Sequence, residues 1–279
     1  MNSVNSIQKD LDSIFKERKD KKFAYLYSRT NEDLNSLFNL INVEDKNVLS
    51  VLSSSDYLFS SLYKGVREID TFDINAITYR YYYLRKWLIA NGYIDALNVS
   101  CKDIFKLIST ISPKSSEEKD SVLFWKYYFN LSRSRKDCIY YHDDLFIDIA
   151  AKKVVYEDDL CEVAKILDGY DLKFQHMNIC NGYNSDKKYD VIFLSNIMDY
   201  NRNNKSRMNN ICENLDELLS DDGIIVMSHF SFASNFNLEI NIFSKYFDYI
   251  PLDIVDSGVN YYIYKKKKKL YAGIKIKSL

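Results

Sequence analysis

The segment from 47 to 90 alternates between short apolar runs and helical patterns, and this alternation constrains the fold more than any other feature. Residues 47–52 form an apolar run between polar neighbours, which predicts a buried strand, and 69–72 predicts a second one. A helical pattern follows each run, at 57–64 and at 76–90. Strand, helix, strand and helix in such a short stretch are typical of βαβ units, so we expect a parallel sheet.

A second alternating part follows later in the chain. Residues 172–177 are expected to form a strand, and 190–195 and 224–228 predict two more, buried strands. Apolar residues recur at helical spacing over 204–219, which predicts an amphipathic helix. The other elements expected here are a turn at 221–223, a helix at 237–246, strands at 249–255, 259–264 and 270–276, and a hairpin tip at 265–269. The chain is therefore expected to be an α/β protein.

Residues 91–170 separate the two alternating parts and are mostly helical by pattern, with a loop expected at 112–120. We interpret them as a helical insertion that acts as a lid or binds substrate. Residues 1–40 are expected to form a helical arm at the N-terminus. The length allows one large domain or two small ones, and we expect a single domain over 1–279.

The scarcity of glycine limits which nucleotides such a sheet can bind. The chain has 7 glycines among 279 residues, where the usual frequency would give roughly 20. They are too far apart to form G-x-G-x-x-G or G-x-x-x-x-G-K-[ST]. A dinucleotide pyrophosphate needs the close backbone approach that glycine allows. An NAD(P)-dependent enzyme is therefore a disfavoured hypothesis.

Charge and hydropathy disfavour other classes of partner. The 38 basic and 39 acidic residues give a net charge of −1, so no whole-chain field attracts nucleic acid or a membrane surface. The sequence contains no run of 18 apolar residues that would predict a transmembrane helix. The first 22 residues lack the apolar core of a signal peptide. None of the five cysteines is in C-x-x-C spacing, and no spacing suggests zinc. We expect a cytoplasmic protein without a metal; the sequence does not indicate its oligomeric state.

Polar residues follow every predicted strand of the sheet, where each strand ends. Residues 53–56 follow the first strand, Asp73 the second, Asn178 the third, Ser195 the fourth and His229 the fifth. Ligands of open α/β sheets bind beyond the carboxyl ends of the strands. Asp73 lies 20 residues after Ser53, where a carboxylate binds ribose hydroxyls in nucleotide-binding sheets. These residues predict a nucleoside site.

A nucleoside without phosphates suits a loop of serines better than a dinucleotide does. Ser53, Ser54 and Ser55 can make a tight turn, and their hydroxyl and N–H groups can hold a carboxylate. S-adenosylmethionine has an adenine, a ribose and an amino-acid arm, and no phosphate. This chemistry favours S-adenosylmethionine over NAD as the cofactor.

The chain resembles the class I S-adenosylmethionine-dependent methyltransferase superfamily. The resemblance rests on the blocks 48–56 and 71–75 and on the later blocks 189–197 and 222–226, with 25–32 matching more loosely. Within the superfamily the chain looks most like a branch close to the aminocarboxypropyl transferases of betaine-lipid synthesis, through its serine-rich loop ending in Asp, its Asp-Ile-Asn motif and the following Leu-Arg-Lys. The resemblance implies a Rossmann-like methyltransferase fold with a mostly parallel seven-stranded sheet and helices on both faces.

The resemblance also implies a set of cofactor-binding residues. Tyr27 and Arg29 would hold the methionine carboxylate from an N-terminal segment that folds over the cofactor, and Asn178 would contact adenine. The full cofactor-binding set is Tyr27, Arg29, Thr30, Ser53, Ser54, Ser55, Asp56, Asp73, Ile74, Asn75, Asn178, Ile179, Ser195 and Asn196.

The candidate catalytic residues are Asp199, Tyr200 and His229, because they follow strands that end at the predicted site. A structural role competes in each case: Asp199 can cap the next helix, and His229 can be a hydrogen-bonded core histidine. His176 is expected in the core. The cluster at 142–144 is interpreted as an acidic helix N-terminus rather than a metal site.

The function expected is S-adenosylmethionine-dependent transfer to a small-molecule or lipid-like acceptor, with methyl and aminocarboxypropyl transfer both open. The sequence 195–198 lacks the prolines of the Asn/Asp-Pro-Pro-aromatic motif, so a nucleic acid is an unlikely partner. The alternative, from a different class, is a non-catalytic binding or assembly protein that keeps the fold. The serines in place of glycines favour that alternative.

Overall fold

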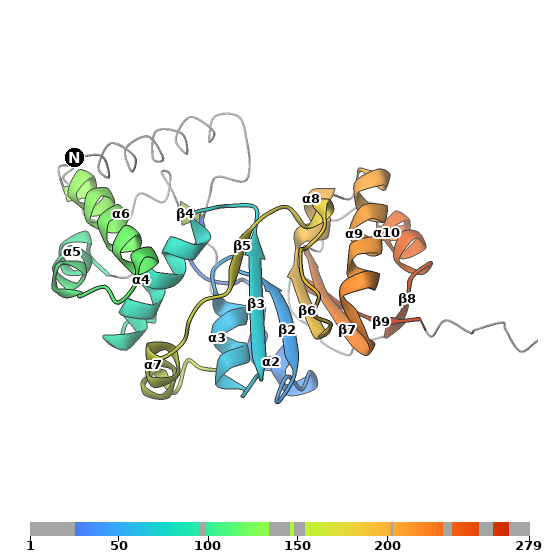
Figure 1. Cartoon of the computed structure of the whole chain (residues 1–279), viewed down its shortest axis with the longest axis horizontal. Coiled ribbons are helices and arrows are strands. Elements are labelled where there is room, and N and C mark those ends of the chain that lie inside the picture. Colours follow the sequence, from blue (N-terminus) through green and yellow to red (C-terminus); the bar gives the residue numbers. More distant parts are fainter. Residues whose placement is uncertain are drawn as a thin grey trace, which may run out of the picture. The chain divides into compact units, whose positions relative to one another are not determined.

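The chain is an α/β protein with a mostly parallel seven-stranded sheet, which confirms the expected fold class (Figure 1). The computed structural model describes residues 26–94, 99–133, 146–147, 154–201, 203–230, 236–250 and 259–267. The strand order is β5-β3-β2-β6-β7-β9-β8. The chain divides into two compact units, Met1–Ile179 and Cys180–Leu279, which we describe separately.

The sheet of the first unit is built from the predicted βαβ segment. Strand β2 (Asn47–Val51) pairs in parallel with β3 (Glu68–Asp73), and β3 pairs in parallel with β5 (Phe174–His176). Helix α3 (Asp56–Tyr63) connects the first two strands. The apolar residues of β2 are fully buried, as a continuous apolar run in a parallel sheet requires.

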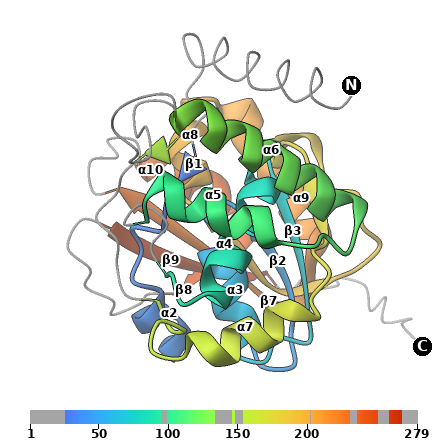
Figure 2. The ribbon, with the colours of Figure 1, turned by 90° about the vertical axis from the view of Figure 1, so that its left-hand side faces the viewer.

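Helix α4 (Thr78–Ala90) is the central helix of the first unit, with ten of its thirteen residues buried. The reason is that it is packed on several sides, by α6 as well as by α7. Figure 2 shows α5 and α6 lying over α4. The remaining helices of this unit are α2 (Leu34–Leu40), α5 (Cys101–Thr110), α6 (Ser116–Arg133) and α7 (Leu160–Asp168).

The described part of the expected insertion is mostly helical, as predicted, but the loop inside it differs from the expected one in length. Helix α6 begins at Ser116, so the loop expected at 112–120 is shorter than predicted. Helix α7 packs against α3 and α4. Residues 142–144 lie outside the described residues.

The N-terminal arm is not wholly helical, contrary to expectation. Strand β1 (Leu26–Tyr27) pairs in parallel with β4 (Phe146–Ile147), and only α2 is helical among the described residues up to 40. Residues 1–25 lie outside the described part of the chain. The pairing of β1 with a partner more than a hundred residues away gives this segment an extended backbone.

The second unit contains the other strands. Strand β6 (Tyr189–Ser195) pairs in parallel with β7 (Leu219–Phe230), and β9 (Val259–Lys266) pairs antiparallel with both β7 and β8 (Phe247–Ile250). Its helices are α8 (Ile197–Asn201), α9 (Lys205–Leu218) and α10 (Phe236–Phe243). A short 3-10 turn, η3 (Ile179–Asn181), spans the boundary between the units along the chain.

The turn expected at 221–223 is part of β7. Between the pairs Tyr189–Leu219 and Val191–Ile224, β6 advances by two residues and β7 by five. The three extra residues bulge out of the ladder, so the turn signal of Gly223 marks an irregularity inside a strand.

One expectation about the C-terminal part is wrong, a second is confirmed in its described part with an earlier start, and a third falls outside the described residues. Lys265 and Lys266 belong to β9 rather than to a hairpin tip. Lys266 Nζ donates to the main-chain oxygens of Asp216 and Leu219, at 2.8 and 3.0 Å, and so satisfies carbonyls at the end of α9. The strand expected from Tyr249 is part of β8, which begins earlier, at Phe247. Residues 251–258 and 270–276 lie outside the described part.

Candidate functional site

The loop after β2 has the backbone of a glycine-rich loop although it contains no glycine. Ser53 and Ser55 have φ angles of 43° and 69°, in the left-handed region that glycine adopts without strain. Ser55 is fully buried, and its hydroxyl has no hydrogen-bond partner among the described residues. Left-handed serines with an unsatisfied hydroxyl are strained, and strain of this kind gathers at functional sites.

Asp73 lies at the end of β3 and is bound to this loop. Its Oδ2 accepts a hydrogen bond from the backbone N–H of Ser53 at 2.8 Å, and its Oδ1 accepts one from Asn75 N–H at 2.8 Å. Burial raises the pKa of Asp73 from 3.8 to about 6, although the backbone N–H groups around it lower the pKa in part. Each carboxylate oxygen has a second acceptor position, which suits a pair of ribose hydroxyls.

The neighbours of Asp73 are arranged by local backbone contacts. Ile74 is 40% exposed, which is unusual for a large apolar side chain at a strand end. Asn75 Oδ1 accepts from Ile77 N–H at 3.0 Å, a short turn that leads towards α4. Met177 N–H donates to the main-chain oxygen of Asp73 at 2.8 Å, so Asn178 follows directly beside the end of β3.

Asp56 begins helix α3 and is saturated with hydrogen bonds from its own unit. Its two oxygens accept from Thr30 N–H, from the hydroxyls of Ser54 and Tyr156, and from the guanidinium of Arg85, at 2.6 to 2.7 Å. Burial raises its pKa, but the Arg85 cation and the Tyr156 hydroxyl outweigh that effect, so the pKa of Asp56 lies below its ordinary value. Asp56 is therefore better placed to shape the loop than to contact a ligand.

The N-terminal segment lies against the same loop, through its backbone. Thr30 contributes its N–H to Asp56, and its hydroxyl donates to Glu32 at 3.0 Å. The guanidinium of Arg29 is buried and faces the carboxylate of Glu157 at 3.6 Å. Arg29 therefore already has an anionic partner within the protein, and Tyr27 is half-buried in β1.

The second unit brings two of the three candidate catalytic residues together. His229 Nδ1 lies 2.8 Å from Asp199 Oδ1; the histidine is buried and the aspartate is partly buried. The His229 ring also packs edge-on against Tyr262. Tyr200 is 40% exposed on α8, next to Asp199 in sequence. A carboxylate at Nδ1 favours the tautomer in which Nε2 carries the lone pair, which is the arrangement of a histidine base.

The remaining predicted residues lie at the ends of β5 and β6 and in η3. Ser195 ends β6 with a φ of 50°, a third left-handed serine, and Asn196 follows it. Ile179 is buried in η3. His176, expected in the core, is instead exposed, and its Nε2 lies 2.9 Å from the main-chain oxygen of Ile74. In the described part of the chain, no group of three or more His, Cys, Asp or Glu residues is arranged to hold a metal.

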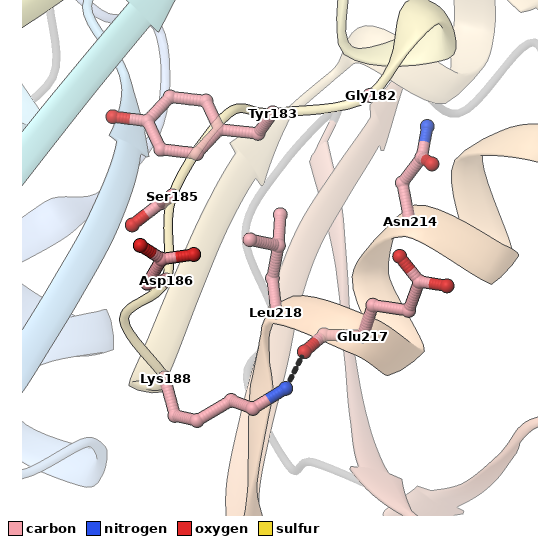
Figure 3. Close-up of a pocket in the computed structure, with 8 residues that line it drawn as sticks. All are labelled: Gly182, Tyr183, Ser185, Asp186, Lys188, Asn214, Glu217 and Leu218. Atoms are coloured by element: carbon pink, nitrogen blue, oxygen red, sulfur yellow. Dashed lines mark hydrogen bonds between the residues drawn. The ribbon is translucent and has the colours of Figure 1, made fainter.

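A pocket of about 380 Å³ lies in the second unit, at the opposite end of β6 from Ser195 (Figure 3). In Figure 3, Leu218 stands between the loop that carries Asp186 and the α9 side chain of Glu217. The amine of Lys188 donates to the main-chain oxygen of Glu217. None of the sequence-predicted site residues lines this pocket.

Two residues that organise the first unit's site, Arg85 and Tyr156, are not among the site residues predicted from the sequence. Arg85 contributes to the family resemblance only as part of a helix motif, and Tyr156 lies in no motif. The signal for Arg85 was available: an arginine within the aromatic run of 81–89 has to be buried, and a buried arginine needs an acidic partner. Tyr156 carried no such signal, since it lies 100 residues from Asp56.

Replacing Ser55 by glycine is expected to stabilise the protein. Ser55→Gly removes the left-handed strain and the unsatisfied hydroxyl, which together outweigh the extra backbone entropy of glycine by about 1 kcal/mol. The melting temperature should rise by about 2–4 °C. Ser55→Ala is the matched control, because it removes the hydroxyl and keeps the strain. A glycine variant no more stable than the alanine variant would contradict the strained-loop interpretation.

Comparisons with known proteins identify similar structures only. No protein-family model and no curated protein sequence matches the chain. A ribosomal protein L11 methylase from Lactobacillus delbrueckii subsp. bulgaricus is 13% identical, with a TM-score of 0.43 over 87% of this chain and 82% of that one. The N-methyltransferase NodS from Bradyrhizobium japonicum WM9, bound to S-adenosylhomocysteine, is 9% identical, with a TM-score of 0.44 over 96% of this chain and 100% of that one. The PH0226 protein from Pyrococcus horikoshii OT3 is 10% identical, with a TM-score of 0.47 over 87% and 95%.

Proposed function

We propose that the protein is an S-adenosylmethionine-dependent transferase. The observation that carries this proposal is the junction of β2 and β3: a loop with glycine-like backbone angles at Ser53 and Ser55, bound to a buried carboxylate, Asp73, at the end of the neighbouring parallel strand. A loop of this shape allows close approach of a ligand to the backbone, and the carboxylate accepts hydroxyl groups. A ribose is the group that fits both requirements.

The charges around the loop favour a nucleoside without phosphates. The N-terminus of a helix after the first strand is where dinucleotide-binding sheets hold pyrophosphate. Here the first turn of that helix, α3, contains the buried carboxylate of Asp56. Asp73 adds a second carboxylate at the same loop. Asp56 is paired with the Arg85 guanidinium, so the charge that disfavours a polyphosphate here and tolerates the sulfonium cation of S-adenosylmethionine is chiefly that of Asp73.

The chemical step that we propose is methyl transfer to a small-molecule or lipid-like acceptor. The sulfonium group of the cofactor is already an activated electrophile, so the protein needs to position the acceptor and to remove its proton where necessary. His229 is the proposed base, because Asp199 at 2.8 Å fixes its Nδ1–H tautomer and stabilises the imidazolium that forms. Tyr200, which follows Asp199 in sequence and is 40% exposed, is proposed to contact the acceptor. Aminocarboxypropyl transfer uses the same cofactor and is the other outcome of a product assay.

Ligand binding tests the proposal before any acceptor is known. S-adenosylhomocysteine at 100 times its dissociation constant should stabilise the native state by about 2.7 kcal/mol and raise the melting temperature by several degrees. NAD+ and ATP serve as comparison ligands and should leave the melting temperature unchanged. A protein that millimolar S-adenosylmethionine and S-adenosylhomocysteine fail to stabilise would overturn the proposed function.

A further inference from the structure

One buried carboxylate joins the N-terminal segment 28–32 to the loop at 53–55. Asp56 Oδ2 accepts the backbone N–H of Thr30 at 2.6 Å and the hydroxyl of Ser54 at 2.7 Å. Asp56 is 1% exposed, so water does not compete for these charge-assisted bonds. The two segments are thus connected through a single side chain, although Thr30 and Asp56 are 26 residues apart in sequence.

The other oxygen of this carboxylate is held by two side chains from elsewhere in the unit. Asp56 Oδ1 accepts from Arg85 Nη1 at 2.7 Å and from the Tyr156 hydroxyl at 2.6 Å. Arg85 Nη2 also donates to the Tyr156 oxygen at 3.0 Å, and Nη1 donates to the Ser54 main-chain oxygen at 2.5 Å. Arg85 and Tyr156 are themselves fully buried. Arg85 and Tyr156 therefore hold the carboxylate of Asp56 in one orientation.

The same two elements hold the N-terminal segment a second time. Tyr81 lies one turn before Arg85 on α4, and its hydroxyl donates to the main-chain oxygen of Ser28 at 2.6 Å. Glu157 follows Tyr156 and faces the Arg29 guanidinium at 3.6 Å. Segment 28–32 is thus held by α4 at Ser28 and by the turn at 156–157 at Arg29, both just before its bond to Asp56 at Thr30.

We propose that Asp56 is a latch between segment 28–32 and the loop at 53–55, and that Arg85 and Tyr156 are positioning residues that act through it. Weakening the latch therefore loosens segment 28–32 and the loop at 53–55 together. It also makes nucleoside affinity depend on the Tyr156 hydroxyl, a group that donates to Asp56. This last part rests on the proposed function.

Removing one hydroxyl tests the latch, and the chain offers a matched control. Tyr156→Phe deletes a bond to Asp56 without changing the ring. Tyr82→Phe deletes a hydroxyl that has no hydrogen-bond partner among the described residues, from a ring that is equally buried and that packs on the same residue, Phe59, at the same centroid distance of 5.8 Å. The two variants therefore differ in whether a hydrogen bond to Asp56 is lost.

Backbone amide hydrogen exchange in the ligand-free protein is the first measurement. Thr30 N–H reports on the latch and Ser53 N–H, bound to Asp73, reports on the loop. In Tyr156→Phe both amides should exchange about tenfold faster than in the wild type, and in Tyr82→Phe neither should change. Unchanged exchange in Tyr156→Phe would overturn the latch, and so would a faster Thr30 with an unchanged Ser53.

Calorimetry with S-adenosylhomocysteine is the second measurement. Tyr156→Phe should bind about tenfold more weakly than the wild type and than Tyr82→Phe. Equal affinity in Tyr156→Phe and the wild type would reduce the latch to a structural role and overturn the positioning claim. If the wild type does not bind this ligand, the proposed function fails, and hydrogen exchange alone still decides whether the latch joins the two segments.

Discussion

Arg85→Met is expected to destabilise the protein by about 3–5 kcal/mol, because it leaves the carboxylate of Asp56 buried without the guanidinium that is paired with it. Asp56 and Arg85 are each 1% exposed, and their charged groups are 2.7 Å apart. Methionine fills a similar volume, so the loss comes from the unpaired charge rather than from a cavity. The melting temperature should fall by about 10 °C or more, as measured by thermal unfolding.

Two further variants show whether the unpaired charge is the cause. Asp56→Asn combined with Arg85→Met removes both charges of the buried pair, so the double variant should be more stable than Arg85→Met alone. Lys165→Met breaks an exposed ion pair with Glu162 and should leave the melting temperature unchanged. A melting temperature of Arg85→Met within a degree or two of the wild type would show that the ion pair does not hold this part of the fold.

Asp73→Asn is expected to weaken S-adenosylhomocysteine binding at pH 7 by about 100-fold, measured by calorimetry. Asp73 is buried at the end of β3 and is proposed to accept the two ribose hydroxyls of the cofactor. Hydrogen bonds to a charged acceptor are stronger than those to a neutral amide by about 1 kcal/mol each, and two such bonds account for most of this factor. Asparagine has nearly the same shape but only one acceptor oxygen, so the variant also loses one of the two backbone bonds, from Ser53 N–H or from Asn75 N–H.

The pH dependence separates a charge effect from a change of shape. The pKa of Asp73 is raised to about 6, and a proton on the carboxyl competes with the ligand hydroxyls. Affinity in the wild type should therefore be about tenfold weaker at pH 5 than at pH 7, while Asp73→Asn should show no such difference. A wild-type affinity that does not change over this range would rule out an ionised Asp73 as the ribose acceptor.

The same pKa shift affects stability with the opposite sign from a salt-bridged carboxylate. The native state keeps a proton on Asp73 that the unfolded state releases, since the folded pKa is about 6 against an ordinary value of 3.8. The contribution of Asp73 to the free energy of unfolding therefore falls as pH rises from about 4 to about 6. In Asp73→Asn this part of the slope should disappear.

Elements with a strong local pattern were predicted well. The apolar runs that became β2, β3 and β6 are bounded by polar residues and are buried in a parallel sheet, and the amphipathic pattern at 204–219 became α9 with an N-cap at Asn204. Where pairing decides the backbone, prediction failed: β1 is a strand because of β4, and the turn at 221–223 is a bulge because of β6. Such pairing depends on distant residues, which a local pattern does not contain.

The sequence by itself determined the α/β class of this protein, the succession of its main strands along the chain and the polar residues at their ends. Each of these follows from hydrophobic periodicity and local turn chemistry. It also showed that serines occupy the loop where a nucleotide-binding sheet usually has glycine. Only the tertiary structure decided that Ser53 and Ser55 adopt glycine-like angles, and that Asp56 joins segment 28–32 to the loop at 53–55. Three of the partners of Asp56 lie 26, 29 and 100 residues away in the chain, and contacts over such separations depend on tertiary packing, which a local pattern does not contain.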